Sequence, residues 1–313
     1  MNKGKMSESA LKRSVLKKTG IYNKRSGAGI GADAGYIRRA NGDLMISTAC
    51  IMGEDRGNGE LCLTRAVNSM ACAGGKALAA SVSLICPAKD PESFARLIMD
   101  EVIRACDRCG IEPVSGNTLI GDTASISVSV TGEAGNAITP PDQDKDRIIV
   151  MDGWAGNAGA AMLAVKNYSR LTERFTEGFI RKAISGFNEI GIYDRAYAFA
   201  EATGGRIAMH DISEGGVFGA LWELLERENA GCRVDLKAIP IKQAAIEVCE
   251  ILDVSPYQLR GDGGLLAMVE DTPENRTLGT VIGAVTSDRD RVIINGEERR
   301  FLEPNRYDGY YEA

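Results

Sequence analysis

The sequence contains a single histidine, His210, among its 313 residues. A metal site built from several histidines is therefore excluded, because each such site needs more than one imidazole ligand. The chain also lacks a Walker-type glycine and lysine loop and a Gly-x-Ser-x-Gly elbow. These absences argue against a P-loop nucleotidase and against a serine hydrolase of the α/β type.

Long apolar segments and paired metal-binding cysteines are missing too. No run approaches the roughly 20 apolar residues that a helix needs to cross a bilayer, and residues 1–16 have no apolar signal core, so we expect a cytoplasmic protein with no membrane contact. Eight cysteines are scattered along the chain, which favours reduced thiols over a disulfide framework. Cys106 and Cys109 have CxxC spacing without a second pair, so we expect no zinc site there.

Positive charge is concentrated at the N-terminus. Between Lys3 and Arg25 there are eight Lys or Arg and one acid, Glu8, whereas the whole chain has 37 basic and 43 acidic residues. We interpret residues 1–26 as a basic flexible arm on an acidic body. The arm either contacts phosphates or an acidic partner, or is a solvated tail. No basic stripe with interleaved aromatic residues follows it, so we expect no nucleic-acid binding.

Residues 27–145 are expected to form one α+β domain. Asn41-Gly42 favours a tight hairpin, and Pro91 and Gly110 have the positions of a helix start and a helix stop. We expect strands at residues 36–38, 44–48, 77–86 and 124–131, and helices at residues 61–73 and 91–109.

Pro140-Pro141 and the charged residues around them mark 135–147 as a linker, which places the domain boundary near residue 145. Residues 146–313 are expected to form a second α/β domain that begins with the apolar strand Ile148 to Met151. Helices and strands alternate here as well. We expect helices near residues 158–166, 176–187, 194–203, 213–228 and 243–252, and strands near residues 207, 234, 265, 281 and 292.

The most informative stretch covers residues 209–222, where a strand leads through an acidic segment into an apolar helix. Ser213 is expected to cap this helix. Gly215 and Gly216 leave the first N–H groups unobstructed, which is typical of a phosphate or carboxylate pocket. Close packing of a core helix explains the same glycines equally well.

At this stretch a resemblance adds to the pattern. Met209 to Gly216 resembles the second-domain motif of the AIR synthase-related superfamily, in which His-Asp or Arg-Asp precedes Ser or Thr and a glycine pair. Asp152 to Ala161 and Asp253 to Leu266 resemble two further landmarks in the family order. From about Gly27 onward the chain is similar to this superfamily and, within it, to hydrogenase-maturation factors of the HypE type.

The resemblance implies a fold, an assembly and a ligand. The implied fold is a two-domain α/β (α+β) architecture with a dimerising first domain, and the implied assembly is a homodimer or a heterodimer with a paralogue. The implied cofactors are ATP and Mg²⁺, bound between the domains. Asp211 is the implied catalytic residue, and His210 either orients Asp211 or satisfies a backbone group.

The first-domain motifs depart from the family pattern at the acids. A Gly-Asp-Asp-Ala motif, a Ser/Thr-Thr-Asp strand end, an Asn-Asp pair and a Gly-Gly-Asp/His-Thr turn are matched by Gly31-Ala32-Asp33-Ala34, Ser47-Thr48-Ala49, Asn68-Ser69 and Ser115-Gly116-Asn117-Thr118. Mg²⁺ prefers hard oxygen ligands, so Asp33 remains the implied metal ligand. The implied nucleotide-site residues are Gly29, Gly31, Asp33, Asn68, Asn117, Ser213, Gly215 and Gly216.

Two functional hypotheses follow. The first is an ATP-dependent ligase or dehydratase that activates an amide or carbonyl oxygen by phosphoryl transfer, as in hydrogenase maturation. The second is a degenerate pseudo-enzyme that acts as a scaffold or partner subunit without ATP turnover, which the missing acids favour. HypE-type chemistry is carried by a C-terminal cysteine, whereas this sequence ends Tyr310-Tyr311-Glu312-Ala313, so we do not expect that reaction in its usual form.

Overall fold

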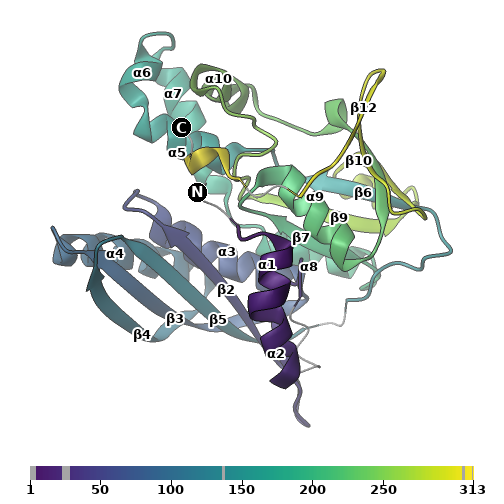
Figure 1. The fold of residues 1–313 in the computed structure, drawn as a ribbon, viewed down its shortest axis with the longest axis horizontal. Helices are drawn as coiled ribbons and strands as arrows, with labels where there is room; N and C mark the ends of the chain where they lie inside the picture. Colours follow the sequence, from purple (N-terminus) through teal and green to yellow (C-terminus); the bar gives the residue numbers. More distant parts are fainter. Residues whose placement is uncertain (1–4, 23–28, 136–137, 305–306, 312) are drawn as a thin grey trace.

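A computed structural model describes residues 5–22, 29–135, 138–304, 307–311 and 313. Over these residues the chain forms two mixed sheets with helices packed against them, as expected for an α/β protein of two domains (Figure 1). Within the described residues, no helix combines the length and the apolar character that crossing a membrane requires.

The first sheet has five strands among the described residues, in the order β1-β2-β5-β3-β4. All neighbouring pairs are antiparallel except β3 and β4. The expected hairpin around Asn41-Gly42 is confirmed, since β1 and β2 pair across it. The elements of this part are β1 (Gly35–Ile37), β2 (Leu44–Met52), α3 (Asn58–Cys72), β3 (Gly75–Pro87), α4 (Pro91–Cys109), β4 (Glu112–Gly121) and β5 (Ser125–Ala134).

One expectation about this sheet was wrong. We interpreted Ser115 to Thr118 as a turn, but these residues lie within β4 and pair with β3. Gly116 permits this pairing, because a Cβ there would lie 2.1 Å from the carbonyl oxygen of Val82. The glycine that suggested a turn therefore marks close contact between two strands.

Specific contacts fix the start of α3 and both ends of α4. Pro91 opens α4 after Asp90, whose side chain accepts a hydrogen bond from the Ser93 N–H, and Gly110 ends it with a φ of 66°. The buried carboxylate of Glu101 on α4 accepts the N–H groups of Gly57 and Gly59 at the start of α3. The beginning of α3 is therefore held by α4.

The second sheet has seven strands among the described residues, in the order β12-β11-β8-β10-β6-β9-β7. Its strands are β6 (Arg147–Asp152), β7 (Ala208–Ile212), β8 (Gly231–Asp235), β9 (Gly264–Glu270), β10 (Thr280–Thr286), β11 (Arg291–Asn295) and β12 (Glu298–Phe301). Its helices are α5 (Asn157–Lys166), α6 (Tyr168–Thr172), α7 (Glu177–Ile184), η2 (Ser185–Glu189), α8 (Tyr193–Ala202), α9 (Gly216–Arg227), η3 (Leu236–Ala238), α10 (Gln243–Leu252), η4 (Asn275–Thr277) and η5 (Gly309–Tyr311).

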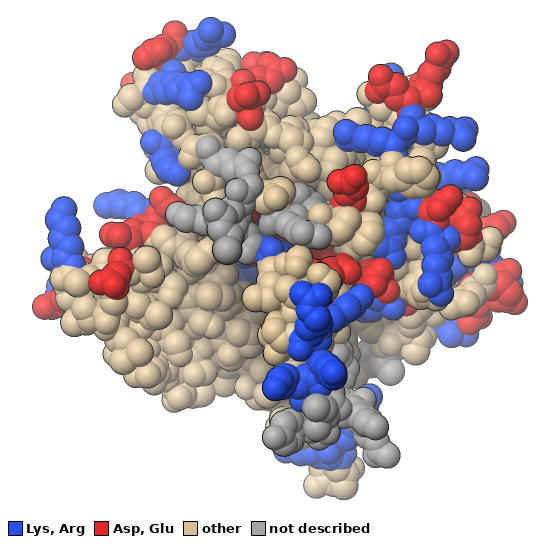
Figure 2. All heavy atoms as spheres, in the orientation of Figure 1, with Lys and Arg blue, Asp and Glu red and all other residues tan. Residues whose placement is uncertain are grey.

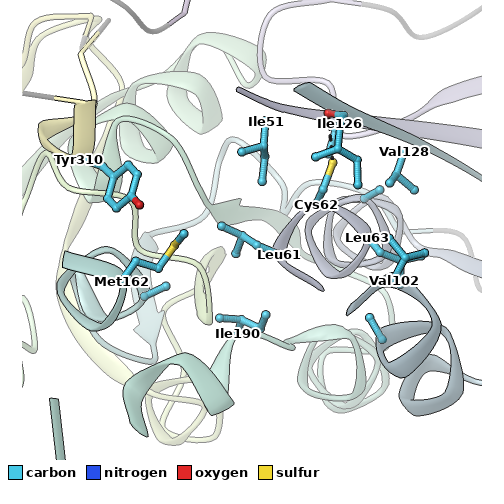
Figure 3. Packing of buried hydrophobic residues seen from close by; sticks show 14 of the residues in the cluster. Ile51, Leu61, Cys62, Leu63, Val102, Ile126, Val128, Met162, Ile190 and Tyr310 are labelled. Carbon is cyan, nitrogen blue, oxygen red and sulfur yellow. Dashed lines mark hydrogen bonds between the residues drawn. The ribbon is translucent and has the colours of Figure 1, made fainter. Parts of the chain in front are cut away.

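A large apolar cluster extends across both domains. It includes Ile51 and Leu61 of the first domain together with Met162, Ile190 and Tyr310 of the second (Figure 3). Helix α3 lies at the centre of this arrangement and contacts β2, β5 and α4 on one side and α8 and β7 on the other. Burial of this shared surface stabilises one relative placement of the two domains.

The N-terminal arm is partly helical and packs on α9. Residues Glu8–Leu11 (α1), Lys12–Leu16 (η1, a π-helix) and Lys17–Tyr22 (α2) follow one another in front of the second domain (Figure 1). Lys5 Nζ lies 2.7 Å from Glu223 Oε1, and Trp222 Nε1 donates to Glu8 Oε1 at 2.5 Å. Residues 5–12 therefore contact the protein body, which the solvated-tail interpretation did not anticipate.

Truncating Ile98 tests the packing of α4. Ile98 is fully buried, so Ile98→Ala is expected to lower the free energy of unfolding by about 2–5 kcal/mol, measured by urea denaturation. Ile103 lies on the same helix with 41% of its surface exposed, and Ile103→Ala is expected to cost below about 1 kcal/mol. Equal losses in the two variants would contradict the described packing.

Candidate functional site

Strand β7 brings two ionisable side chains to the junction between the domains. His210 and Asp211 are consecutive, so they point to opposite sides of the strand. His210 Nε2 lies 3.0 Å from Glu223 Oε2 on α9, and Asp211 Oδ1 accepts a hydrogen bond of 2.7 Å from Ser69 Oγ on α3. Strand β7 thereby connects a helix of each domain.

Asp33 completes this group from the glycine-rich segment of the first domain. Its side chain is 2% exposed, and its Oδ2 lies 3.0 Å from Arg227 Nη1. Its Oδ1 lies 2.5 Å from His210 Nδ1. One donor atom from each of Asp33, His210 and Asp211 lies within 4.8 Å of the other two. We call Asp33, His210, Asp211, Glu223 and Arg227 the junction cluster.

The electrostatics of the junction cluster are dominated by burial and close charges. Burial raises the pKa of Asp211 to about 6, and the negative charge of Asp33 acts in the same direction. Burial lowers the pKa of His210, but the Asp33 carboxylate outweighs it and the pKa rises to about 10. Burial raises the pKa of Glu223, yet Lys5 and His210 hold it at about 2. The cluster thus combines three acidic groups, Asp33, Asp211 and Glu223, with the cationic partners His210, Arg227 and Lys5.

Arg227 joins the junction cluster to the backbone of both domains. Its guanidinium donates to the carbonyl oxygens of Gly31 and Met209 as well as to Asp33. Gly31 has a φ of 70°, and a Cβ there would lie 2.2 Å from the Glu223 carbonyl oxygen. Glycine at position 31 therefore lets the segment that carries Asp33 lie directly on α9. Gly29 is exposed, with open space around it.

Asn68 does not join the cluster, contrary to the interpretation of it as a nucleotide-site residue. Its side-chain N–H donates to the Ile190 carbonyl oxygen at 2.8 Å, and its oxygen accepts the Ile192 N–H at 2.9 Å. Both polar ends of this buried amide are therefore occupied by the second domain. Asn68 joins α3 to the segment before α8.

The expected cap of α9 was also wrong. Gly215 is the N-cap residue, with a φ of 85°, and the Ser213 carbonyl oxygen accepts the N–H of Gly216. The Phe218 N–H donates to the Tyr257 carbonyl oxygen, and a Cβ at Gly216 would lie 2.5 Å from that oxygen. The geometry favours the close-packing alternative for Gly216, because these two helix N–H groups already have partners in the chain.

Asn117 lies apart from the other expected site residues within this chain. It is exposed on β4, the edge strand of the first sheet opposite β1, whereas Asp33 immediately precedes β1. The structure therefore brings Gly31, Asp33 and Asp211 together but leaves Asn117 on the other edge of the sheet.

An interdomain ion pair beside the junction cluster was missed by sequence reasoning. Arg65, one turn before Ser69 on α3, makes two hydrogen bonds to Asp262, of 2.8 and 2.9 Å. It also lies 3.3 Å from Glu214. The burial of these side chains has no signature in the sequence.

Glu223 and Arg227 did have a sequence signal. They are four residues apart on a helix that is otherwise apolar on that side, so they share one face. Helical spacing alone places the two side chains on one face of α9. Their partners come from three other segments, the arm, β7 and the segment before β1.

The donors of the junction cluster fit one divalent cation. Asp33 and Asp211 provide carboxylate oxygens, and Ser69 provides a hydroxyl beside Asp211. Ala32 and Ala49 provide no ligand atoms at the positions where the family pattern has acids. The set of carboxylate ligands is therefore smaller than the family resemblance implies.

Removing one partner of the Arg65–Asp262 pair tests its role at the junction. Asp262→Asn is expected to lower the free energy of unfolding by about 3–5 kcal/mol, because it removes the carboxylate charge that makes two hydrogen bonds to a buried guanidinium and leaves Glu214 as the remaining counter-charge. The matched pair Arg276–Asp271 has the same two-bond geometry on the surface, so Asp271→Asn is expected to cause no measurable change. Urea denaturation measures both, and equal effects would contradict the buried interdomain pair.

Comparison with known proteins identifies the same two domains in the same order. Residues 31–134 match the family model for the AIR synthase related protein, N-terminal domain, and residues 143–293 match the C-terminal domain of that family. A hydrogenase expression/formation protein of Methanocaldococcus jannaschii is 24% identical, over 93% of this chain and 91% of its own. The carbamoyl dehydratase HypE of Rhodobacter capsulatus is 25% identical over 68% of this chain. That match spans 62% of the Rhodobacter protein.

Solved structures share the fold. AaThiL complexed with AMPPCP and TMP has a TM-score of 0.71 at 19% identity, covering 95% of this chain and 98% of its own. HypE in a HypE–HypF complex has a TM-score of 0.70 at 16% identity, covering 93% and 99%. HypE in complex with ATP has a TM-score of 0.61 at 18% identity, covering 96% of each. With both family models matched in order along the chain, this protein belongs to the AIR synthase-related family and is similar to its HypE members.

Proposed function

We propose that this chain is an ATP-dependent enzyme of the HypE-like type that activates an amide or carbonyl oxygen by phosphoryl transfer. The observation that carries the proposal is the meeting of Asp33, Ser69 and Asp211 at the domain junction. Nucleotide-bound relatives support it, since similar structures hold ATP or AMPPCP. The pseudo-enzyme alternative has no support from the named relatives.

The chemistry assigns a role to Asp211. In the proposed reaction the substrate oxygen attacks the γ-phosphorus of ATP, the bond from that phosphorus to its bridging oxygen breaks, and ADP leaves. With a primary amide substrate, the C–O bond of the phosphorylated oxygen then breaks, phosphate departs, and the nitrogen loses both of its protons, which leaves a nitrile. Asp211 is the proposed proton acceptor, because a carboxylate with a pKa of about 6 is a suitable base near neutral pH.

The remaining residues of the junction cluster position this base. Ser69 donates to Asp211 and holds one of its oxygens, while Arg227 holds Asp33 against α9. With nucleotide bound, Mg²⁺ would neutralise phosphate charge, and Asp33 is the carboxylate that would hold it, which leaves Asp211 as the base. Lys5 is paired with Glu223 at the edge of the cluster, and it is the arm residue that we propose to contact phosphates.

Calorimetric titration with ATP, with and without Mg²⁺, tests the proposed nucleotide site. Binding is expected only with Mg²⁺ and is expected to be lost in Asp33→Ala.

ADP formation with acetamide and a thiocarbamate as probes is expected to fall at least about 100-fold in Asp211→Asn, which keeps the shape of the side chain but cannot accept a proton. The exposed variant Glu173→Gln is the control and is expected to match the native protein. Absence of ATP binding to the native protein would overturn the proposal.

The proposed assembly is a homodimer formed through the first sheet. Large apolar side chains are exposed on one face of β2, β3 and β4, and we call this the open sheet face: Ile46, Met52, Leu78, Ile85, Val114 and Leu119. Figure 2 shows a broad surface almost free of charged atoms over these strands. A second copy of this chain would cover an apolar face with an equally apolar one.

The double variant Leu78→Asp/Leu119→Asp tests this assembly. Light scattering after size exclusion is expected to give twice the chain mass of 33.5 kDa for the native protein and the single chain mass for the variant, because two buried carboxylates would oppose association. Ile103→Asp, on exposed α4 surface outside the open sheet face, is the control and is expected to stay dimeric. A monomeric native protein would contradict the homodimer and leave pairing with a paralogue as the remaining arrangement.

A further inference from the structure

A cavity of about 560 Å³ lies between the two domains and shares no lining residue with the junction cluster. The first domain contributes the segment Asp55 to Gly57, which joins β2 to α3. The second domain contributes residues of α5, α7 and η2 together with Tyr310. Pockets that hold a small organic molecule have volumes of roughly 300–1,000 Å³, so this cavity is large enough for one.

Much of the cavity wall is apolar. Met162 of α5, Phe187 of η2 and Tyr310 line it, and Figure 3 shows Met162 and Tyr310 on neighbouring segments. Val165 of α5 also lines the cavity, with 50% of its surface exposed. Aromatic rings and a thioether favour contact with a flat aromatic ligand. A ligand that covers this surface is stabilised by removing apolar area from water.

Contacts between the domains hold the aromatic residues of the wall in place. Gly57 has a φ of 91°, and a Cβ there would lie 2.8 Å from Phe187 Cζ. Phe187 therefore packs directly on the backbone of the first domain. Burial raises the pKa of the Tyr310 phenol, and the nearby Asp55 carboxylate raises that pKa further. Both rings contact the segment before α3, so the cavity has its shape before any ligand binds.

Positive charge is concentrated around the cavity. Its lining includes the cations Arg56, Lys166 and Arg181 and one acid, Asp55, although the chain as a whole has 37 basic and 43 acidic residues. Arg56 is exposed and makes no ion pair or hydrogen bond among the described residues. Its guanidinium is therefore available to an anion, and a carboxylate can accept two parallel hydrogen bonds from it.

The other two cations already have partners. Lys166 Nζ donates to the Ala313 carbonyl oxygen at 3.1 Å and lies 5.4 Å from the centre of the Tyr310 ring. Arg181 lies 3.0 Å from Glu177, one turn away on the exposed side of α7, and such a surface pair stabilises little. Both cations add positive potential to the cavity, which attracts an anion.

We propose that this cavity binds a small aromatic carboxylate, with its ring against Met162, Phe187 and Tyr310 and its carboxylate beside Arg56. The ligand contacts both domains, since Arg56 belongs to the first and the ring-binding residues belong to the second. The apolar wall and the surrounding cations together select an organic anion over a neutral apolar molecule. No residue of the proposed nucleotide site takes part, so the two proposals stand or fall separately.

Equilibrium dialysis of the full chain with 2-naphthoate tests the site in the absence of nucleotide. Saturable binding of one equivalent is expected, with a Kd on the order of 100 μM for a ligand of this size. 2-Naphthalenemethanol has the same rings without the charge, and acetate has the charge without the rings. Each is expected to bind at least about 10-fold more weakly than 2-naphthoate, because each lacks one of the two kinds of contact.

Three variants separate the charge contact from the ring contact. Arg56→Gln is expected to weaken binding of 2-naphthoate about 10-fold and to leave binding of 2-naphthalenemethanol unchanged. Lys182→Gln is the matched control, since Lys182 is an exposed cation of α7 outside the residues that line the cavity, and it is expected to bind as the native chain does. Val165→Trp places a bulky ring in the cavity from an exposed position and is expected to abolish binding of both compounds. Circular dichroism checks that each variant folds.

The open sheet face is the competing location for an aromatic ligand. Binding is expected to be unchanged in Leu78→Asp/Leu119→Asp, and its loss there would place the ligand on the sheet and overturn the inference. The same conclusion would follow from no saturable binding, from equal affinity for 2-naphthoate and 2-naphthalenemethanol, or from undiminished binding in folded Val165→Trp. Tighter binding of dodecanoate than of 2-naphthoate would assign the cavity to an acyl chain and would also overturn it.

Discussion

Burial of helix α3 on both of its sides is the constraint on which the rest of the structure depends. Thirteen of its 15 residues are buried, and the helix contacts the first sheet on one side and α8 and β7 on the other. Its polar residues Arg65, Asn68 and Ser69 cannot remain unpaired in such a position. Each finds a partner in the second domain, so the apolar packing and the polar pairing both select the same domain placement.

Charge at the junction has been redistributed relative to the family pattern. Alanine at positions 32 and 49 removes two acids of the first domain, while Arg227 and His210 lie beside the acid that remains, Asp33. Strand β7 supplies Asp211 from the other side. The proposed nucleotide chemistry depends on this pair of carboxylates, which are held by groups that are themselves fixed in place.

Local sequence signals predicted most elements, because turns and caps act over a few residues. Asn41-Gly42 and Gly110 were interpreted correctly for this reason. Contacts with partners that are distant in the sequence were not predicted. Asn68 was expected at the nucleotide but is bonded to residues more than 120 positions away, and Ser213 was expected to cap a helix that begins at Gly215. Glycine is ambiguous in the same way, since turn formation and close packing favour the same residue.

The sequence by itself determined the two-domain α/β architecture and the family, and it pointed to Asp33 and Asp211 as candidate site residues, since periodicity, turn residues and short motifs are properties of neighbouring positions. Only the tertiary structure decided which groups surround those carboxylates. The partners come from the arm, α3, β7 and α9, and their burial makes each contact a strong electrostatic one. Such contacts depend on how distant segments pack, so no local pattern encodes them.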